Sequence, residues 1–239
     1  MLIVFFATVI RSAFGFGEAL IAVPLLAFYL PLSVAAPLAV LISITVAAIV
    51  VAQDFKHIHF ASTGWLVLST LAGIPLGLLL LTSHHPRLVK AALGFIIVGF
   101  SIYSLAGRAP LELKRDSRPW ILLCGFLAGI LGGAYGMNGP PLAVYGTMRR
   151  WSAQQFRATL QGYFLPASII GMAGYWLAGL WTPAVTRLYL LSLPATLLGV
   201  IAGRVLNQRL PAGKFTKIIY AGLAGTGLLL IVQAAIVNH

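Results

Sequence analysis

Long apolar stretches follow one another along almost the whole chain, and short polar loops separate them. A stretch of about 20 apolar residues matches the hydrocarbon thickness of a bilayer when it forms a helix. Six stretches reach this length, at residues 34–52, 62–82, 88–106, 153–178, 184–206 and 213–236. The pattern therefore predicts an all-α polytopic membrane protein.

Two further apolar regions are interrupted in the middle. Residues 1–30 are interrupted by the segment 11–18, and residues 119–149 are interrupted by the Gly-rich segment 132–141. Each leaves two arms of about 10–14 residues, which as helices reach only about 15–21 Å. Because the hydrocarbon core is roughly 30 Å thick, we expect a broken or re-entrant helix in each region.

The two interrupted regions also match each other in sequence. A shift of 119 residues places Phe16 and Gly17 on Tyr135 and Gly136. Matching positions continue downstream in the same order, which predicts two homologous halves. The predicted division is a first transmembrane repeat at 1–106, a connecting loop at 107–118 and a second transmembrane repeat at 119–239.

Basic residues discriminate between two topologies. The chain has 16 Lys and Arg against four acids, a net charge of +12. If each interrupted region returns to the side it entered from, there are six spans, and one face keeps only Arg87, Lys90 and Arg187. If each region spans once, there are eight spans and the bases divide more evenly. The positive-inside rule favours inverted repeats of three spans plus a re-entrant helix; eight spanning helices remain the alternative.

Composition excludes several function classes. The chain is 60% hydrophobic and 8% charged, whereas soluble domains carry about 25% charged residues. The bases lie in short loops, so we expect no nucleic-acid partner. We find no nucleotide-binding loop, metalloprotease helix or nucleophile elbow, and we predict no enzyme, no cofactor and no metal. His57 and His59 follow Asp54 in a basic segment that we interpret as a solvated loop.

The two breaks are the candidate substrate site. Non-helical backbone within a membrane is tolerated only where protein buries it or where it lines a cavity, so we place both breaks at the centre. A new helix follows each break, and two converging helix N-termini would attract an anion; close helix packing is the other interpretation of the glycines. The candidate substrate-binding residues are Gly15, Phe16, Gly17, Glu18, Tyr135, Gly136, Met137, Asn138, Gly139, Arg157 and Gln161.

Two charged residues near the breaks each have a structural and a functional interpretation. Glu18 is the one acid that we predict within the membrane. It is either a structural ion-pair partner of Arg11, or a functional group that couples protons or acts as counterion to a substrate-binding arginine. Arg157 and Gln161 share one helical face, and arginine binds oxyanions with two hydrogen bonds. Alternatively, Arg157 reaches the lipid head groups from a helix end.

These motifs resemble a known family. Ala13-Phe-Gly-Phe-Gly17, followed by Pro24-Leu25, resembles the first-half motif of the TauE/SafE sulfite exporter permeases (TSUP, four-toluene-sulfonate uptake). The segment from Gly132 to Leu142 and the segment Phe156-Arg-Ala-Thr159 resemble its second-half motifs, and the resemblance covers essentially the whole chain. Glu18 departs from it, because members commonly carry a third glycine there.

The resemblance implies transport of sulfur-containing anions, such as sulfite or organosulfonates, outward across a bacterial inner (plasma) membrane. We therefore predict a multi-pass secondary transporter that exports such anions by alternating access around the two breaks. Its partners are the small anion and the lipid bilayer, while protons or another coupling ion and a homodimer stay open. An anion channel and a permease for a non-sulfur organic anion are the alternatives.

Overall fold

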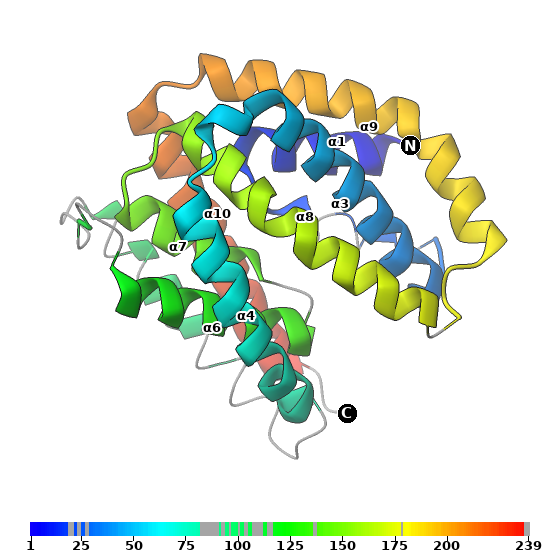
Figure 1. Cartoon of the computed structure of the whole chain (residues 1–239), viewed down its shortest axis with the longest axis horizontal. Helices are drawn as coiled ribbons and strands as arrows, with labels where there is room; N and C mark the ends of the chain where they lie inside the picture. Colours follow the sequence, from blue (N-terminus) through cyan, green and yellow to red (C-terminus); the bar gives the residue numbers. More distant parts are fainter. Residues whose placement is uncertain are drawn as a thin grey trace. The chain divides into compact units, whose positions relative to one another are not determined.

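The computed structural model describes residues 1–18, 22, 25–26, 29–81, 91, 94–95, 97–99, 101–102, 105–106, 112–113, 117–135, 138–177 and 179–236. Every regular element within these residues is helical, which confirms the predicted all-α class. The elements are α1 (Leu2–Phe14), α3 (Leu32–Asp54), the 3-10 helix η1 (Phe55–His57), α4 (Phe60–Leu81), α6 (Arg118–Tyr135), α7 (Gly139–Met148), α8 (Ala153–Leu177), α9 (Pro183–Arg209) and α10 (Ala212–Ile236) (Figure 1).

Five of the six predicted spans coincide with α3, α4, α8, α9 and α10. The sixth, at 88–106, lies partly outside the described residues. By length and hydropathy alone, two described helical segments could cross a membrane, Ser33–His57 and Pro183–Arg209, and shorter apolar helices accompany them.

The chain folds as two compact units that are interleaved in sequence. Unit 1 consists of residues 1–63 and 153–210, and unit 2 of residues 64–152 and 211–239. Each unit therefore takes helices from both predicted repeats. The repeats at 1–106 and 119–239 were defined by sequence similarity, and they remain a prediction.

Within unit 1, α3 and α9 run in the same direction. The Thr45 and Tyr189 hydroxyl oxygens are 2.6 Å apart near the middle of α3 and the start of α9. Further along both helices, a carboxylate oxygen of Asp54 lies 3.8 Å from a guanidinium nitrogen of Arg204. Both contacts advance together along the two helices, so α3 and α9 are parallel, as Figure 1 also shows.

α8 runs against α3. The Ser43 and Ser168 hydroxyl oxygens lie 2.8 Å apart. Eleven positions later on α3, Asp54 forms an ion pair with Arg157, which lies eleven positions earlier on α8. From the first contact to the second, the residue numbers rise along α3 and fall along α8. The two helices are therefore antiparallel, as Figure 1 also shows.

α1 packs along the second half of α9 through two glycines. A β-carbon on Gly199 would lie 2.9 Å from the Thr8 β-carbon, and one on Gly203 would lie 2.6 Å from the Ser12 β-carbon. Small residues let helix backbones approach in this way. Both contacts advance in the same sense, so α1 is parallel to α9, and therefore also to α3.

In unit 2, α4 and α6 form a second parallel pair that is packed through glycines. The Thr70 hydroxyl donates to the Gly125 carbonyl over 2.9 Å. One turn further along, a β-carbon on Gly73 would lie 3.0 Å from the Gly129 α-carbon. Glycine thus mediates close helix packing in both units.

After α6 and α7 the chain lies again beside the residues that precede α6. The Leu113 amide donates to the Met148 carbonyl over 3.0 Å, and the Arg149 guanidinium donates to the Leu113 carbonyl over 2.6 Å. Residues just before α6 therefore lie beside residues at the end of α7. The two helices contact each other within this unit.

α6 is longer than the sequence predicted. Its 18 residues continue through Gly132 and Gly133 to Tyr135, whereas we expected an arm of 10–14 residues. Glycine inside a helix costs only about 1 kcal/mol relative to alanine, and the neighbouring contacts of α6 offset that cost. The break is therefore narrower than predicted. α7 begins at Gly139 with prolines in its first turn, as expected.

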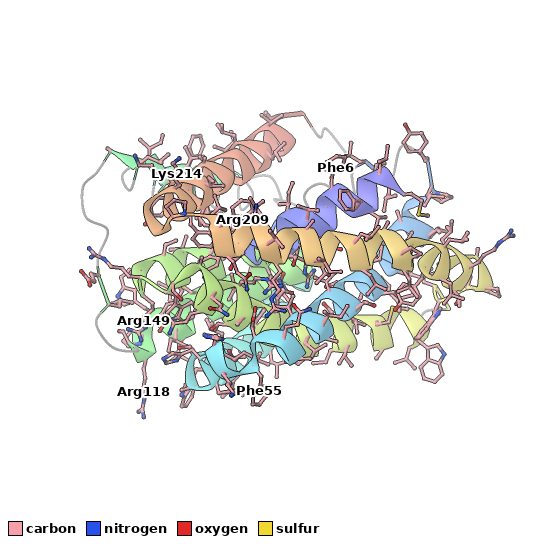
Figure 2. The ribbon with its side chains drawn as sticks, turned by 90° about the horizontal axis from the view of Figure 1, so that it is seen from above. Phe6, Phe55, Arg118, Arg149, Arg209 and Lys214 are labelled. Carbon is pink, nitrogen blue, oxygen red and sulfur yellow. The ribbon has the colours of Figure 1, made fainter. Side chains whose placement is uncertain are left out.

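Large apolar side chains are exposed along the helices of unit 1. Phe6 on α1 is 57% exposed and Phe55 on η1 is 56% exposed (Figure 2). Leu190 and Trp176 are similarly exposed on α9 and α8. Extended apolar exposure of this kind is typical of surfaces that contact lipid or another apolar partner.

Candidate functional site

The first predicted break is present at the end of α1. Gly15 has a φ of +83°, and its amide donates to the Arg11 carbonyl over 2.7 Å. Gly17 has a φ of +100°. This left-handed region strongly favours glycine, so the two glycines end the helix at the position that the sequence pattern indicated.

A hydrogen-bonded network holds the break against α8. Arg11 forms an ion pair with Glu18, and its Nε donates to the Gln161 side-chain oxygen over 3.1 Å. Gln161 in turn donates to the Gly15 carbonyl over 3.0 Å. The structural interpretation of Glu18 as the partner of Arg11 is therefore confirmed. Gln161 satisfies a carbonyl that the end of α1 leaves without a helical partner.

Arg157 lies beside the same break. Its side chain is 1% exposed, and its guanidinium forms an ion pair with Asp54 and donates to the Ser12 hydroxyl over 3.2 Å. A guanidinium that is enclosed and paired in this way does not reach lipid head groups. The lipid-anchor interpretation of Arg157 is therefore wrong for this structure.

Asp54 is a site residue that the sequence analysis missed. We expected Glu18 to be the one buried acid and Asp54 to belong to a solvated loop, but Asp54 is 2% exposed. Its carboxylate also lies near Arg204 and accepts a hydrogen bond of 3.4 Å from Gln154. Asp54 directly follows a long apolar run, and a rare acid at such a position was the available signal.

The break lies near the end of unit 1 at which α9 ends, and its predicted position at the centre of the protein remains a prediction. Asn207, near the end of α9, donates to the Ala13 carbonyl over 2.6 Å and to the Ala153 carbonyl over 3.2 Å. Ala153 is the first residue of α8. The cause is the packing of α1 against the second half of α9, which carries the end of α1 toward the end of α9.

The eleven predicted site residues divide between the two units. The six in unit 1 are Gly15, Phe16, Gly17, Glu18, Arg157 and Gln161, and their neighbourhood also contains Arg11, Ser12 and Asp54. Tyr135, Asn138 and Gly139 belong to unit 2. Gly136 and Met137 lie outside the described residues. The convergence of the two breaks on one site remains a prediction.

The site in unit 1 suits recognition of an anion better than bond-making chemistry. Arg11 and Arg157 supply guanidinium groups, which match the oxygens of an oxyanion. Ser12 and Gln161 supply neutral hydrogen-bonding groups. Across the part of the chain that the structure describes, no three His, Cys, Asp or Glu side chains gather closely enough to hold a metal ion.

The family model for the sulfite exporter TauE/SafE matches residues 1–230 of the 239-residue chain. No curated protein and no solved structure matches the chain. The family match includes both glycine-rich breaks and the helix that carries Arg157. The chain therefore belongs to the TauE/SafE sulfite exporter family and is a membrane transport protein.

Proposed function

We propose that the chain is a secondary transporter that exports small sulfur-containing anions, such as sulfite or organosulfonates, across a bacterial inner membrane. Membership of the family supports an anion as the substrate. The observation that carries the proposal is the burial of Arg157 beside the first break, with Gln161 on the same face of α8. A guanidinium offers an oxyanion two hydrogen bonds, and the glycines of the break let a ligand approach the backbone closely.

We further propose six spans and two re-entrant hairpins. In this topology α1 and α3 both run inward from the outer face of the membrane. α8, which follows the second hairpin, runs outward. The parallel arrangement of α1, α3 and α9 and the opposite direction of α8 support this topology. Eight plain spans would instead make α3 parallel to α8 and antiparallel to α9.

The second hairpin has its own support. The hydrogen bond from Leu113 to Met148 brings together the chain before α6 and the chain after α7. Arg150 and Glu112 extend this contact with an ion pair of 3.0 Å. A region that spanned the membrane once would separate these residues by the thickness of the bilayer.

Inverted repeats are supported by the helix pairs of the two units. The shift of 119 residues that relates the two halves aligns α1 with α6. A similar shift of the later helices aligns α4 with α9. In unit 1 the pair is α1 with α9, and in unit 2 it is α6 with α4; both pairs are parallel and packed through glycines. Each unit therefore pairs one helix from the first half of the chain with one helix from the second half, which is consistent with a common repeat.

The distribution of bases in unit 1 supports the orientation. Lys56, Arg204 and Arg209 lie where α3 and α9 end, and Figure 2 labels Arg209. Arg187 lies near the start of α9, at the opposite end of that helix. The positive-inside rule assigns the base-rich end to the cytoplasm, so the first break and Arg157 lie toward the cytoplasmic side of unit 1.

Alternating access requires parts of the protein that move against one another around the substrate. The division into two compact units, each with contacts of its own, supports such a mechanism. Within this proposal, protons or another ion would couple transport to a gradient. The functional assembly would be either a single chain or a homodimer.

A substrate screen in proteoliposomes tests the proposal. Sulfite, thiosulfate, sulfoacetate and carboxylate analogues would be compared, and we expect saturable transport and counterflow for sulfur oxyanions. Arg157→Lys keeps the positive charge but removes the planar fork, so transport should fall by about tenfold or more. Single-channel currents would instead assign an anion channel, and preference for carboxylates would assign a permease for another organic anion.

A further inference from the structure

Asp54 belongs to a cluster in unit 1 that joins the ends of three helices. Asp54 and Arg157 are buried in this cluster, whereas the Arg204 side chain is 38% exposed. It is the last residue of α3, and its carboxylate faces Arg157 near the start of α8 and Arg204 near the end of α9. Gln154 donates to one carboxylate oxygen over 3.4 Å, and Ser12 accepts a hydrogen bond from Arg157 over 3.2 Å. Asp54 is therefore the central anion of the cluster.

Helix energetics do not explain why an acid occupies this position. The end of a helix carries a partial negative charge, which disfavours a carboxylate. Asp54 also makes no side-chain capping hydrogen bond to η1, which it precedes. Its interactions are instead with side chains of α8 and α9, so its role is tied to the arginines.

The cluster has more positive charge and more donors than Asp54 alone satisfies. One carboxylate faces two guanidinium groups, which leaves an excess of one positive charge. The Nε atoms of Arg157 and Arg204 are buried without a hydrogen-bond partner among the described residues. A buried donor without a partner is unfavourable. Both imbalances would be relieved by an additional oxyanion.

We infer that Asp54 is an exchangeable internal counterion, which occupies the guanidinium of Arg157 until the substrate oxyanion replaces it. The inference rests on the proposed function, and it adds Asp54 as a positioning residue together with Arg204 as its second partner. A carboxylate and a sulfur oxyanion present similar oxygen acceptors to a guanidinium. After exchange, Arg204 and Gln154 remain to hold the Asp54 carboxylate, so the carboxylate stays paired.

This exchange gives Asp54 two opposite effects on transport. In the empty protein it competes with the substrate for Arg157, and it therefore weakens substrate binding. After substrate has bound, its return to Arg157 assists release. A residue that only stabilised the fold would not weaken the binding of substrate, and this difference makes the inference testable.

The test compares the parent chain with Asp54→Asn, using the full chain reconstituted in lipid and radiolabelled sulfite as the probe. The amide keeps the shape of the side chain but loses its charge. We expect sulfite to bind on the order of tenfold more tightly, because an internal competitor has been removed. In proteoliposomes KM should fall, and the maximal rate should fall as well, because release is slower.

Two further variants sharpen the result. Glu112→Gln removes an acid from the exposed pair with Arg150 in unit 2, and it should leave sulfite affinity unchanged. Asp54→Glu restores a carboxylate and should return the affinity to nearly that of the parent. If Asp54→Asn yields no folded protein, Arg204→Gln replaces it; Asp54 then serves Arg157 alone, and sulfite should bind more weakly.

The outcomes separate this inference from the proposed function. If the parent binds sulfite through Arg157 but Asp54→Asn binds it equally or more weakly, Asp54 is a structural partner and the counterion exchange is wrong. Unchanged affinity in Arg204→Gln would overturn it in the same way. If the folded parent binds no sulfite at all, the proposed function fails, and the exchange fails with it.

Discussion

Gly15 lies so close to Arg157 that a β-carbon on Gly15 would come within 3.2 Å of the Arg157 α-carbon. The same β-carbon would lie 3.1 Å from a methyl carbon of Leu160. The first helix break is thus in direct contact with the helix that carries the proposed anion-binding arginine. A change in the backbone at the break would move against Arg157 itself.

Gly15→Ala should lower both stability and transport. Alanine at a φ of +83° is strained by about 1–2 kcal/mol, and the added methyl group meets the backbone of α8. We expect a lower melting temperature and a reduced rate of sulfite transport. Gly171→Ala is the matched control, because no atom lies within 4 Å of that position and alanine favours a helix. Equal melting temperatures for the two variants would contradict this account of the break.

Arg157→Gln should abolish transport and also destabilise the protein. Without Arg157 the buried Asp54 carboxylate keeps only Arg204, at 3.8 Å, and Gln154, so we expect a part of the roughly 3–5 kcal/mol that a fully unpaired buried charge costs. The double variant Asp54→Asn with Arg157→Gln removes both charges, and it should recover much of the lost stability without recovering transport. Thermal unfolding and proteoliposome uptake would measure the two effects separately. Transport by the double variant would show that Arg157 does not bind substrate.

Glu18→Gln should weaken the first break by removing the ion-pair partner of Arg11. We expect a lower melting temperature, with a loss on the order of 3–5 kcal/mol that reflects the unpaired Arg11 guanidinium. The pH dependence of sulfite transport should persist if Glu18 serves the structure. A variant with normal stability and a flat pH profile would instead assign proton coupling to Glu18.

Cysteine labelling tests the topology in a Cys124→Ala background. Single cysteines at Ser33, Leu113 and Ser152 would be probed with a membrane-impermeant reagent in right-side-out and inverted vesicles. The hairpin topology places Leu113 and Ser152 inside and Ser33 outside. Labelling of Ser33 and Ser152 from the same side, with Leu113 on the other, would establish eight plain spans.

The sequence predicted the features that are encoded locally. Hydropathy alone located α3, α4, α8, α9 and α10, because a long apolar run must form a helix to satisfy its backbone in a membrane. Gly15 and Gly17 at positive φ follow α1 and prolines begin α7, as the sequence indicated, because these residues act on the backbone at their own positions. The family motifs are local in the same sense, and the family match confirms them.

The sequence misjudged one feature and left another unpredicted, and both depend on neighbouring helices. It ended the first arm of the second break too early, because the backbone hydrogen bonds of α6 continue through Gly132 and Gly133. It did not indicate that the first break lies beside the end of α9, because hydropathy does not reveal how far α1 is displaced along α9. Contacts at Gly199 and Gly203 determine that displacement.

What the sequence determined by itself is an all-helical membrane transport protein whose first helix ends at glycines. The tertiary structure decided which charges meet. Asp54 and Arg157 are 103 positions apart, and Arg11 and Gln161 are 150 apart. No local pattern connects such residues, because burial of a charge depends on the partner that packing brings to it. The structure therefore revealed Asp54 as the anion that Arg157 already holds.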